Sequence, residues 1–299
     1  MCKSPVALVA FNRPEQTKRV LEKILNYQPS QVFLIVDAQR QNRSDDLQKC
    51  QQVRQLLDQT DWNCQVFKNY AETNLGCKQR ISTGLDWVFS KVESAIILED
   101  DCLPDSSFFP FCEELLNRYR DDRHIVAISG DNFQFGRTRT NYSYYYSLYN
   151  HCWGWATWRR VWQHYDVDMK LWETVRDGDW LNDILQNNAA AKYWKHKFQQ
   201  TYIGKFDTWD YQWMLSGWLQ GGLTILPNLN LVSNIGFDSQ SSTHTKNKNS
   251  PFANMLTNTM QFPLKHPPFV IRDRQADDIT FRNMFSLWSR INRKLREFL

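Results

Sequence analysis

The sequence predicts an α/β fold with a largely parallel, doubly wound sheet. Short apolar runs alternate with longer stretches in which apolar residues recur at helical spacing, an alternation typical of strands joined by crossover helices. One run, 95–98, is apolar throughout and is followed directly by Glu99, Asp100 and Asp101. Charges at the carboxyl end of a buried strand lie where open α/β sheets bind ligands. We therefore expect the functional site at this edge of the sheet.

The elements of the first hundred residues follow this alternation in order. Strands are predicted at 6–11, 31–36, 64–68 and 95–98, and helices from Pro14, over 45–58 and over 76–91. Arg13 follows the first strand, Asp37 ends the second, and the acidic triplet ends the fourth. Because the carboxyl ends of parallel strands share one edge, these polar side chains are predicted to converge.

The second half of the chain is less regular. We predict a helix over 108–119, strands at 124–129 and 223–226, and a mainly helical stretch over 160–206 that breaks at Asn187 and Asn188. Residues 137–150 are predicted to form a loop or irregular strands, and residues 238–250 a loop. Trp153, Trp155 and Trp158 crowd around Gly154. Tryptophans here could stack on sugars or fill the core, and the sequence leaves both open.

Composition narrows the possible functions and the cellular compartment. The chain has 299 residues, a net charge of +4 and 42% hydrophobic residues, which are ordinary values for a globular protein and do not indicate nucleic-acid binding. The 7 cysteines include no CxxC pair, which favours a reducing compartment. No signal peptide or apolar run long enough to span a bilayer is visible in the sequence. We expect a cytoplasmic protein.

The C-terminal stretch 281–299 is basic and amphipathic. Its apolar stripe carries Phe, Met, Trp, Ile and Leu side chains, and arginines and lysines surround it. Such a helix suits the anionic inner face of the cell membrane, or it could pack on the protein with a solvated basic face. We divide the chain into a catalytic domain, 1–265, and a tail, 266–299; the domain comprises a nucleotide-binding half, 1–103, and an acceptor-binding half, 104–265.

Two common nucleotide-binding motifs are missing. No GxGxxG follows the first strand, and no GxxxxGK[ST] occurs anywhere, which argues against a dinucleotide-binding fold and a P-loop NTPase. A nucleotide would have to be held by side chains and a metal. Three adjacent carboxylates suit a divalent metal that carries a phosphorylated ligand, since hard cations take carboxylate and phosphate oxygens.

Several segments, taken in order, resemble glycosyltransferases of the GT-A class. They are the strand end at Phe11-Asn12-Arg13, Asp37, the Gly76…Arg80…Gly84 helix, Leu98-Glu99-Asp100-Asp101 (a DXD-type motif in its EDD form), Trp153-Gly154-Trp155 and Trp209-Asp210. The nearest likeness is to the N-acetylglucosaminyltransferase I group and to bacterial family-2-like sugar transferases. The resemblance implies a GT-A (nucleotide-diphospho-sugar transferase) fold, with a Rossmann-like mixed sheet and helices on both faces.

The resemblance also implies roles on the donor side. Asp101 would bind Mn²⁺ (or Mg²⁺), with His244 as a further metal ligand. The nucleotide-sugar donor, most simply a UDP-sugar and possibly UDP-GlcNAc, would be held by a larger set: Arg13 and Asp37 at the base, Asp100 at the ribose, Glu99 at the donor sugar, together with Arg80 and Trp209.

On the acceptor side, the resemblance implies that Asp210 is the general base of an inverting transfer to a glycan, lipid-linked or protein hydroxyl, for example in polysaccharide biosynthesis. Asp207 is a rival for that role, and Asp210 could instead cap the following helix. Trp153, Trp155 and Trp209 could form a stacking floor for sugars.

Two other functions remain open. A sugar-nucleotide nucleotidyltransferase shares the sheet but needs a glycine-rich, arginine-containing loop after the first strand, where this chain has Phe11-Asn12-Arg13-Pro14. A non-catalytic sugar-binding or membrane-associated protein would not need the acidic triplet together with Asp210.

Overall fold

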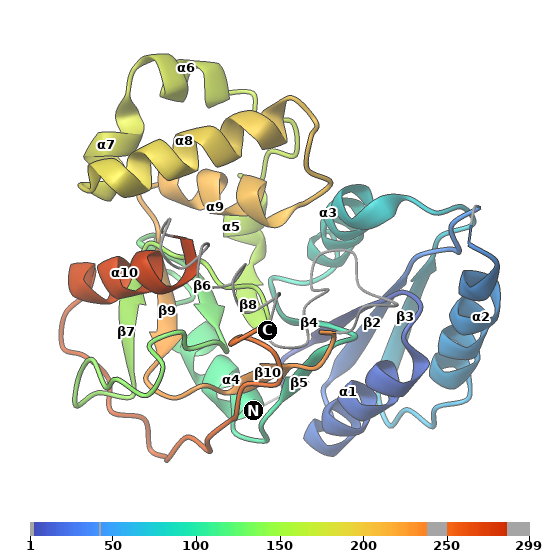
Figure 1. The fold of residues 1–299 in the computed structure, drawn as a ribbon. Coiled ribbons are helices and arrows are strands. Elements are labelled where there is room, and N and C mark those ends of the chain that lie inside the picture. Colours follow the sequence, from blue (N-terminus) through green and yellow to red (C-terminus); the bar gives the residue numbers. More distant parts are fainter. Residues whose placement is uncertain (1–2, 42, 238–249, 286–299) are drawn as a thin grey trace.

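A mixed sheet forms the centre of the molecule (Figure 1). In the computed structural model, which describes residues 3–41, 43–237 and 250–285, the sheet has eight strands in the order β3-β2-β1-β4-β8-β6-β9-β7. Helices lie on both faces, because α1 packs beside α2 and α4 while α3 packs against β2 and β4 on the other side. The predicted α/β class, a Rossmann-like mixed sheet covered by helices, is confirmed.

The first half is the regular part of the sheet. Its strands are β1 (Val6–Ala10), β2 (Gln31–Val36), β3 (Gln65–Tyr70) and β4 (Ser94–Glu99), and its helices are α1 (Pro14–Tyr27), α2 (Ser44–Asp58) and α3 (Gly76–Phe89). β1 pairs in parallel with both β2 and β4, and β2 pairs in parallel with β3. The predicted order of strands and helices is confirmed, with ends shifted by one or two residues.

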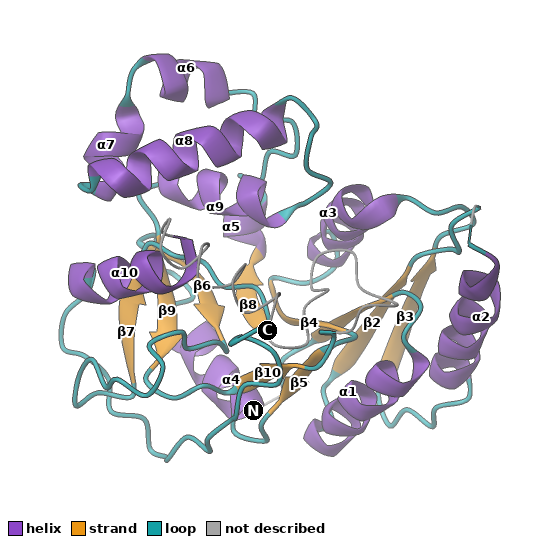
Figure 2. Cartoon of the chain, viewed as in Figure 1, coloured by secondary structure: helices purple, strands orange, loops and turns teal. Residues whose placement is uncertain are grey.

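The second half mixes strand directions (Figure 2). Its strands are β6 (Ile125–Ser129), β7 (Tyr144–Ser147), β8 (Trp155–Trp158) and β9 (Leu223–Pro227), with α4 (Phe108–Arg118) beside them; β5 (Cys102–Pro104) and β10 (Val232–Asn234) form a separate antiparallel pair. β8 inserts between β4 and β6 and runs antiparallel to both. The sequence predicted no strand at β8, because its Trp-Ala-Thr-Trp lacks the alternation of a strand that has one exposed face.

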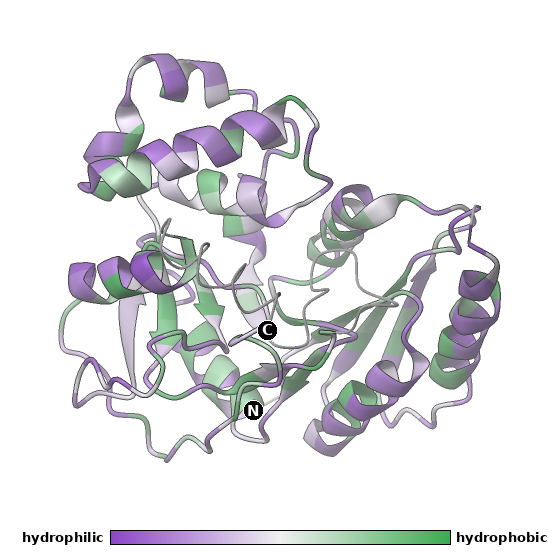
Figure 3. Ribbon diagram, in the orientation of Figure 1, coloured by the Kyte–Doolittle hydropathy of each residue, from purple (hydrophilic) through white to green (hydrophobic). Residues whose placement is uncertain are grey.

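A helical lobe covers one end of the second half. It contains α5 (Arg159–Trp162), α6 (Trp172–Asp177), α7 (Trp180–Leu185), α8 (Asn188–Tyr202) and α9 (Asp210–Leu219). The predicted break at Asn187 is a helix N-cap, since its side chain accepts hydrogen bonds from Ala189 N and Ala190 N at 3.1 Å. Apolar residues line most strands of the sheet, and polar residues face outward on the helices (Figure 3). No helix of the described residues is long and apolar enough to cross a membrane.

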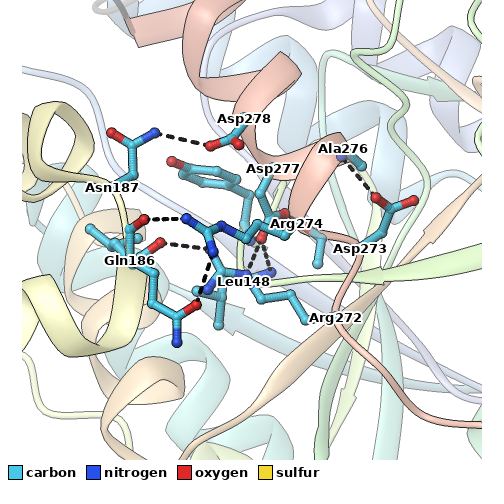
Figure 4. Close-up of polar contacts among 12 residues, drawn as sticks. Leu148, Gln186, Asn187, Arg272, Asp273, Arg274, Ala276, Asp277 and Asp278 are labelled. Carbon is cyan, nitrogen blue, oxygen red and sulfur yellow. Dashed lines mark hydrogen bonds and ion pairs between the residues drawn. The ribbon is translucent and has the colours of Figure 1, made fainter.

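The C-terminal segment packs on the second half of the chain (Figure 4). It contains α10 (Arg274–Thr280) and a π-helical turn, η1 (Phe281–Phe285). Arg272 donates to Asp277 at 2.6 Å and to the carbonyl oxygens of Ile184 and Leu185, at the end of α7. Asn187 donates to Asp278 at 2.9 Å.

The start of the predicted amphipathic stripe is also packed on protein. Phe281 is buried, and the Phe285 ring lies 5.1 Å from that of Trp194. Residues 286–299 lie outside the described residues, so membrane binding by 281–299 stays a prediction.

Candidate functional site

A cleft of about 330 Å³ opens at the carboxyl ends of β1, β2 and β4. That volume falls in the range of small-molecule sites. It is bounded on its other side by the loop that enters α9. The predicted site residues that line it are Arg13, Asp37, Arg80, Glu99, Asp100, Asp101, Trp209 and Asp210. The predicted convergence of polar strand ends is therefore confirmed for the described residues, although their roles stay predictions.

Strand register explains why the acidic triplet meets Arg13. β1 and β4 are parallel neighbours, and Val9 lies opposite Glu99. The residues that follow the two strands therefore leave the sheet side by side. Arg13 Nη1 lies 3.0 Å from Asp100 Oδ1 and 2.7 Å from Asp101 Oδ2. Phe11 N–H donates to Asp100 Oδ2 at 2.9 Å.

Burial changes the protonation of this cluster. It raises the pKa of Glu99 to about 8, and the neighbouring Asp101 and Asp100 add to the shift while Arg13 opposes it. Burial also raises the pKa of Asp100, again opposed by Arg13. Burial and the neighbouring carboxylates thus favour the protonated form of Glu99, and Arg13 favours its ionised form.

Asp37 is held by four donors at the start of α3. Oδ1 accepts from the backbone N–H groups of Ala38 and Leu75, and Oδ2 accepts from Gly76 N and Asn74 Nδ2, all at 2.9–3.2 Å. These hydrogen bonds give Asp37 a structural role at the end of β2. Burial raises the pKa of Asp37, and these backbone hydrogen bonds oppose the shift. Contact with the base stays a prediction.

Arg80 reaches the same end of the cleft from inside α3. Its side chain is almost fully buried; Nη2 donates to Asn69 O at 3.3 Å, and Nε has no partner among the described residues. Burial lowers its pKa, opposed by the Asp37 carboxylate. Arg80 therefore has a donor to spare at the wall of the cleft.

The two candidate bases lie on the opposite wall, in different environments. Asp207 is exposed and accepts a hydrogen bond from Lys78 N at 3.3 Å, at the N-terminal turn of α3. Asp210 is the first residue of α9 and accepts from the Thr208 hydroxyl. The N-cap of α9 is Trp209, and it makes no side-chain capping bond. Asp210 therefore lies in the first turn of α9, one residue inside the N-cap position that the sequence predicted for it.

The three tryptophans proposed as a stacking floor separate. Trp153 and Trp209 line the cleft. Trp155 has no exposed surface, because it lies in β8 between two other strands and stacks on Trp209 with ring centroids 5.4 Å apart. The prediction that Trp155 contacts sugar is wrong. Trp155 lies only two residues from Trp153 in the sequence, which does not show that strand β8 directs Trp155 into the core.

Sequence reasoning missed the roles of Asn12 and Arg40, which line the cleft, and of Asp46, which lies behind them and accepts hydrogen bonds from both. Asp46 is fully buried on α2 and accepts from Asn12 Nδ2 at 2.7 Å and from Arg40 Nε at 2.5 Å. The Arg40 guanidinium lies 5.3 Å from the centroid of the Phe11 ring. Asn12 stands beside Arg13 in the sequence and could have been noticed. Nothing in the sequence distinguishes Asp46 from an ordinary acidic residue in a first helical turn.

The oxygen donors present fit a hard divalent cation. No group of three or more His, Cys, Asp or Glu side chains suited to a metal occurs among the described residues, and His244 lies outside them. Mn²⁺ or Mg²⁺ held by one or two carboxylates and completed by substrate phosphates needs no such group. Asp101 lines the cleft, and the chain passes it so closely at Gly236 that a Cβ there would collide with Oδ2.

Comparison with known proteins gives weak likenesses. No protein-family model and no curated protein sequence matches the chain. Among solved structures, a mannosyltransferase from Pyrobaculum calidifontis in complex with GDP-Man and Mn²⁺ matches with a TM-score of 0.41 and 14% identity, over 56% of this chain and 49% of its own.

HddC from Yersinia pseudotuberculosis matches with a TM-score of 0.33 and 10% identity, over 54% of this chain and 80% of its own. The 4-diphosphocytidyl-2C-methyl-D-erythritol synthase from Anaerococcus prevotii DSM 20548 matches with a TM-score of 0.34 and 10% identity, over 55% and 75%. The match spans about half the length of the mannosyltransferase. None of these likenesses identifies a family.

Proposed function

We propose that this chain is a metal-dependent inverting glycosyltransferase. It transfers a sugar from a nucleotide-sugar donor, most simply a UDP-sugar such as UDP-GlcNAc, to a hydroxyl of a glycan, lipid-linked or protein acceptor. One observation carries the proposal: a single cleft has the strand-end carboxylates on one wall and Asp210 on the other. A transferase needs this arrangement, because the donor diphosphate and the attacking hydroxyl lie on opposite faces of the anomeric carbon.

The donor wall supplies charge for a diphosphate. Asp101, with Asp100 beside it, would hold Mn²⁺ or Mg²⁺, which when bound acts as a Lewis acid on the departing nucleoside diphosphate. Arg13 and Arg80 add cationic donors along the same wall. Guanidinium groups suit phosphate oxygens because they can donate two parallel hydrogen bonds.

The acceptor wall supplies the base. Asp210 takes the proton of the acceptor hydroxyl while the hydroxyl oxygen bonds to the anomeric carbon. The bond between that carbon and the diphosphate oxygen breaks, and the diphosphate leaves with the electron pair. The position of Asp210 at the cleft supports this role. Asp207 is less suited, since its carboxylate bonds the backbone of α3. Trp153 and Trp209 offer aromatic edges or faces for sugar contact at the cleft.

A nucleotidyltransferase is less well supported by the geometry. After β1, only Phe11, Asn12 and Arg13 precede α1, and their backbone is tied to Asp100 through Phe11 N–H. No loop long enough to wrap a triphosphate lies there.

Nucleotide binding is the first test. UDP with Mn²⁺ should raise the unfolding midpoint of the chain, because a ligand that binds only the folded state stabilises it. Asp101→Asn should abolish the metal-dependent part of that shift. Asp45→Asn is the matched control, since Asp45 is an exposed carboxylate paired with Lys49 outside the cleft. A wild-type chain that shows no shift with any nucleoside diphosphate and Mn²⁺ would contradict the proposal.

Product analysis is the second test. A panel of UDP- and GDP-sugars with oligosaccharide acceptors should yield free nucleoside diphosphate and a glycoside of inverted anomeric configuration. Formation of nucleoside triphosphate from nucleotide sugar and pyrophosphate would instead establish the nucleotidyltransferase.

A further inference from the structure

Arg13 occupies the position at the acidic triplet that suits a cation. Its Nη1 donates to Asp100 and to Asp101, at 3.0 and 2.7 Å, and both hydrogen bonds come from that single nitrogen. We propose that Arg13 is a resident counter-ion, which competes with the divalent metal for Asp101 and transfers to the donor diphosphate when metal and nucleotide bind together. The inference rests on the proposed function and assigns Arg13 a role at the phosphates in place of the base.

Charge makes the competition unavoidable. Arg13 is largely buried with its two partners, whose side chains are 5% and 8% exposed. A dication bound at Asp101 would lie within a few ångströms of the guanidinium, and like charges at that separation repel strongly where water is scarce. A metal ion that bound without nucleotide would therefore weaken the ion pairs of Arg13 with Asp100 and Asp101. A diphosphate that arrives with the metal relieves the repulsion, because it supplies anionic oxygens for both cations.

The side chain is equipped for this transfer. A guanidinium has five N–H donors, and the hydrogen bonds that Arg13 makes to the described residues use only Nη1. Nε is buried without a partner among the described residues, and an unsatisfied buried donor costs free energy. Arg13 is also the last residue before α1, and its own side chain makes no capping bond to that helix. Release of the carboxylates would leave the fold of α1 intact.

Thermodynamic linkage gives a measurable consequence. If Arg13 opposes metal alone but assists metal with nucleotide, UDP must tighten Mn²⁺ binding and Mn²⁺ must tighten UDP binding by the same factor. Coupling of this kind is typically about 5- to 150-fold. Neutralising Arg13 should remove the opposition and shrink the coupling.

The experiment is a Mn²⁺ titration followed by electron paramagnetic resonance, with and without UDP. In Arg13→Gln, Mn²⁺ affinity without nucleotide should rise by about tenfold, and the tightening by UDP should fall by a similar factor. Arg13→Lys keeps the charge and should keep weak binding of Mn²⁺ alone. Arg80→Gln is the matched control, because it removes another cleft cation that has no bond to the triplet, and it should leave the affinity for Mn²⁺ alone unchanged.

A folded Arg13→Gln chain, checked by circular dichroism, whose Mn²⁺ affinity without UDP is unchanged or weaker would overturn the inference. An equal gain in Arg80→Gln would do the same, since it would show a general field effect. If Arg13→Gln does not fold, Arg13→Lys decides: tighter Mn²⁺ binding than in Arg80→Gln would contradict the role of charge. If the wild type binds no nucleotide, the proposed function is refuted but the competition between Arg13 and the metal is not, because the Mn²⁺ titrations without nucleotide still test it.

Discussion

The two halves of the molecule form their walls of the cleft by different physical means. In the first half of the chain, the parallel strands β1, β2 and β4 are buried on both faces, and Arg13, Asp37 and Glu99 lie at or just after the points where their apolar runs stop. In the second half of the chain, strand directions are mixed, with β6 and β9 parallel and β8 and β7 antiparallel to them, and the core holds very large side chains, with Trp155, Trp172, Trp194 and Trp213 almost fully buried.

The difference shows which sites a sequence pattern can locate. The carboxyl end of a parallel strand lies at the ligand-binding edge of the sheet, whichever way the chain continues from it. An aromatic residue fits either a core or a sugar site, and its neighbours in space decide. Trp155 and Trp209 stack on one another, yet only Trp209 reaches the cleft.

The largest effect expected on the acceptor wall is on catalysis. Asp210→Asn should lower the rate of sugar transfer by about 10²- to 10⁴-fold, the usual contribution of a general base, while nucleotide binding measured by thermal shift is retained. Asp207→Asn, on the same loop, should keep most of the rate. A reversal of the two results would assign the base to Asp207.

The next effect separates a core tryptophan from an exposed one. Trp155→Ala should reduce the free energy of unfolding by about 3–5 kcal/mol, because it leaves a large cavity beside β4 and β6. Trp180→Ala, at a side chain that is 54% exposed, should change it by less than about 0.5 kcal/mol. Urea unfolding followed by circular dichroism measures both. Similar values for the two variants would contradict the burial of Trp155.

The smallest effect concerns the contact between the C-terminal segment and the second half of the chain. Burial raises the pKa of Asp277 to about 6 from an ordinary value of 3.8, opposed by Arg272 and Ser147. Between pH 3.8 and about pH 6, Asp277 is therefore protonated in the folded state and ionised in the unfolded state. The stability that this carboxyl contributes falls as the pH rises through that range.

Asp277→Asn does not titrate. The unfolding midpoint of the wild type, relative to that of this variant, should decline between about pH 4 and pH 6 and then level off. Thermal unfolding at steps across this range measures the difference. A difference that grows as the pH rises would show that the Arg272 pair outweighs the burial of the carboxyl.

The sequence by itself determined the strands and helices of the first half of the chain and the edge of the sheet at which the predicted site residues meet. Apolar runs fixed β1, β2 and β4, and the polar residues after them were found together at one edge, because the topology of parallel strands leaves them no other place. Helix periodicity located α1, α2, α3 and α4 to within a few residues for the same local reason.

Only the tertiary structure decided the rest. Insertion of β8 between β4 and β6 buried Trp155, and α2 brought Asp46 beneath Asn12 and Arg40. The pairing of β5 with β10 brought Gly236 against Asp101. The pairing of β8 with β4 and β6, the contact of Asp46 with Asn12 and the contact of Gly236 with Asp101 join segments that lie far apart in the chain. They depend on antiparallel pairing and side-chain packing, which leave no periodic signal in the sequence.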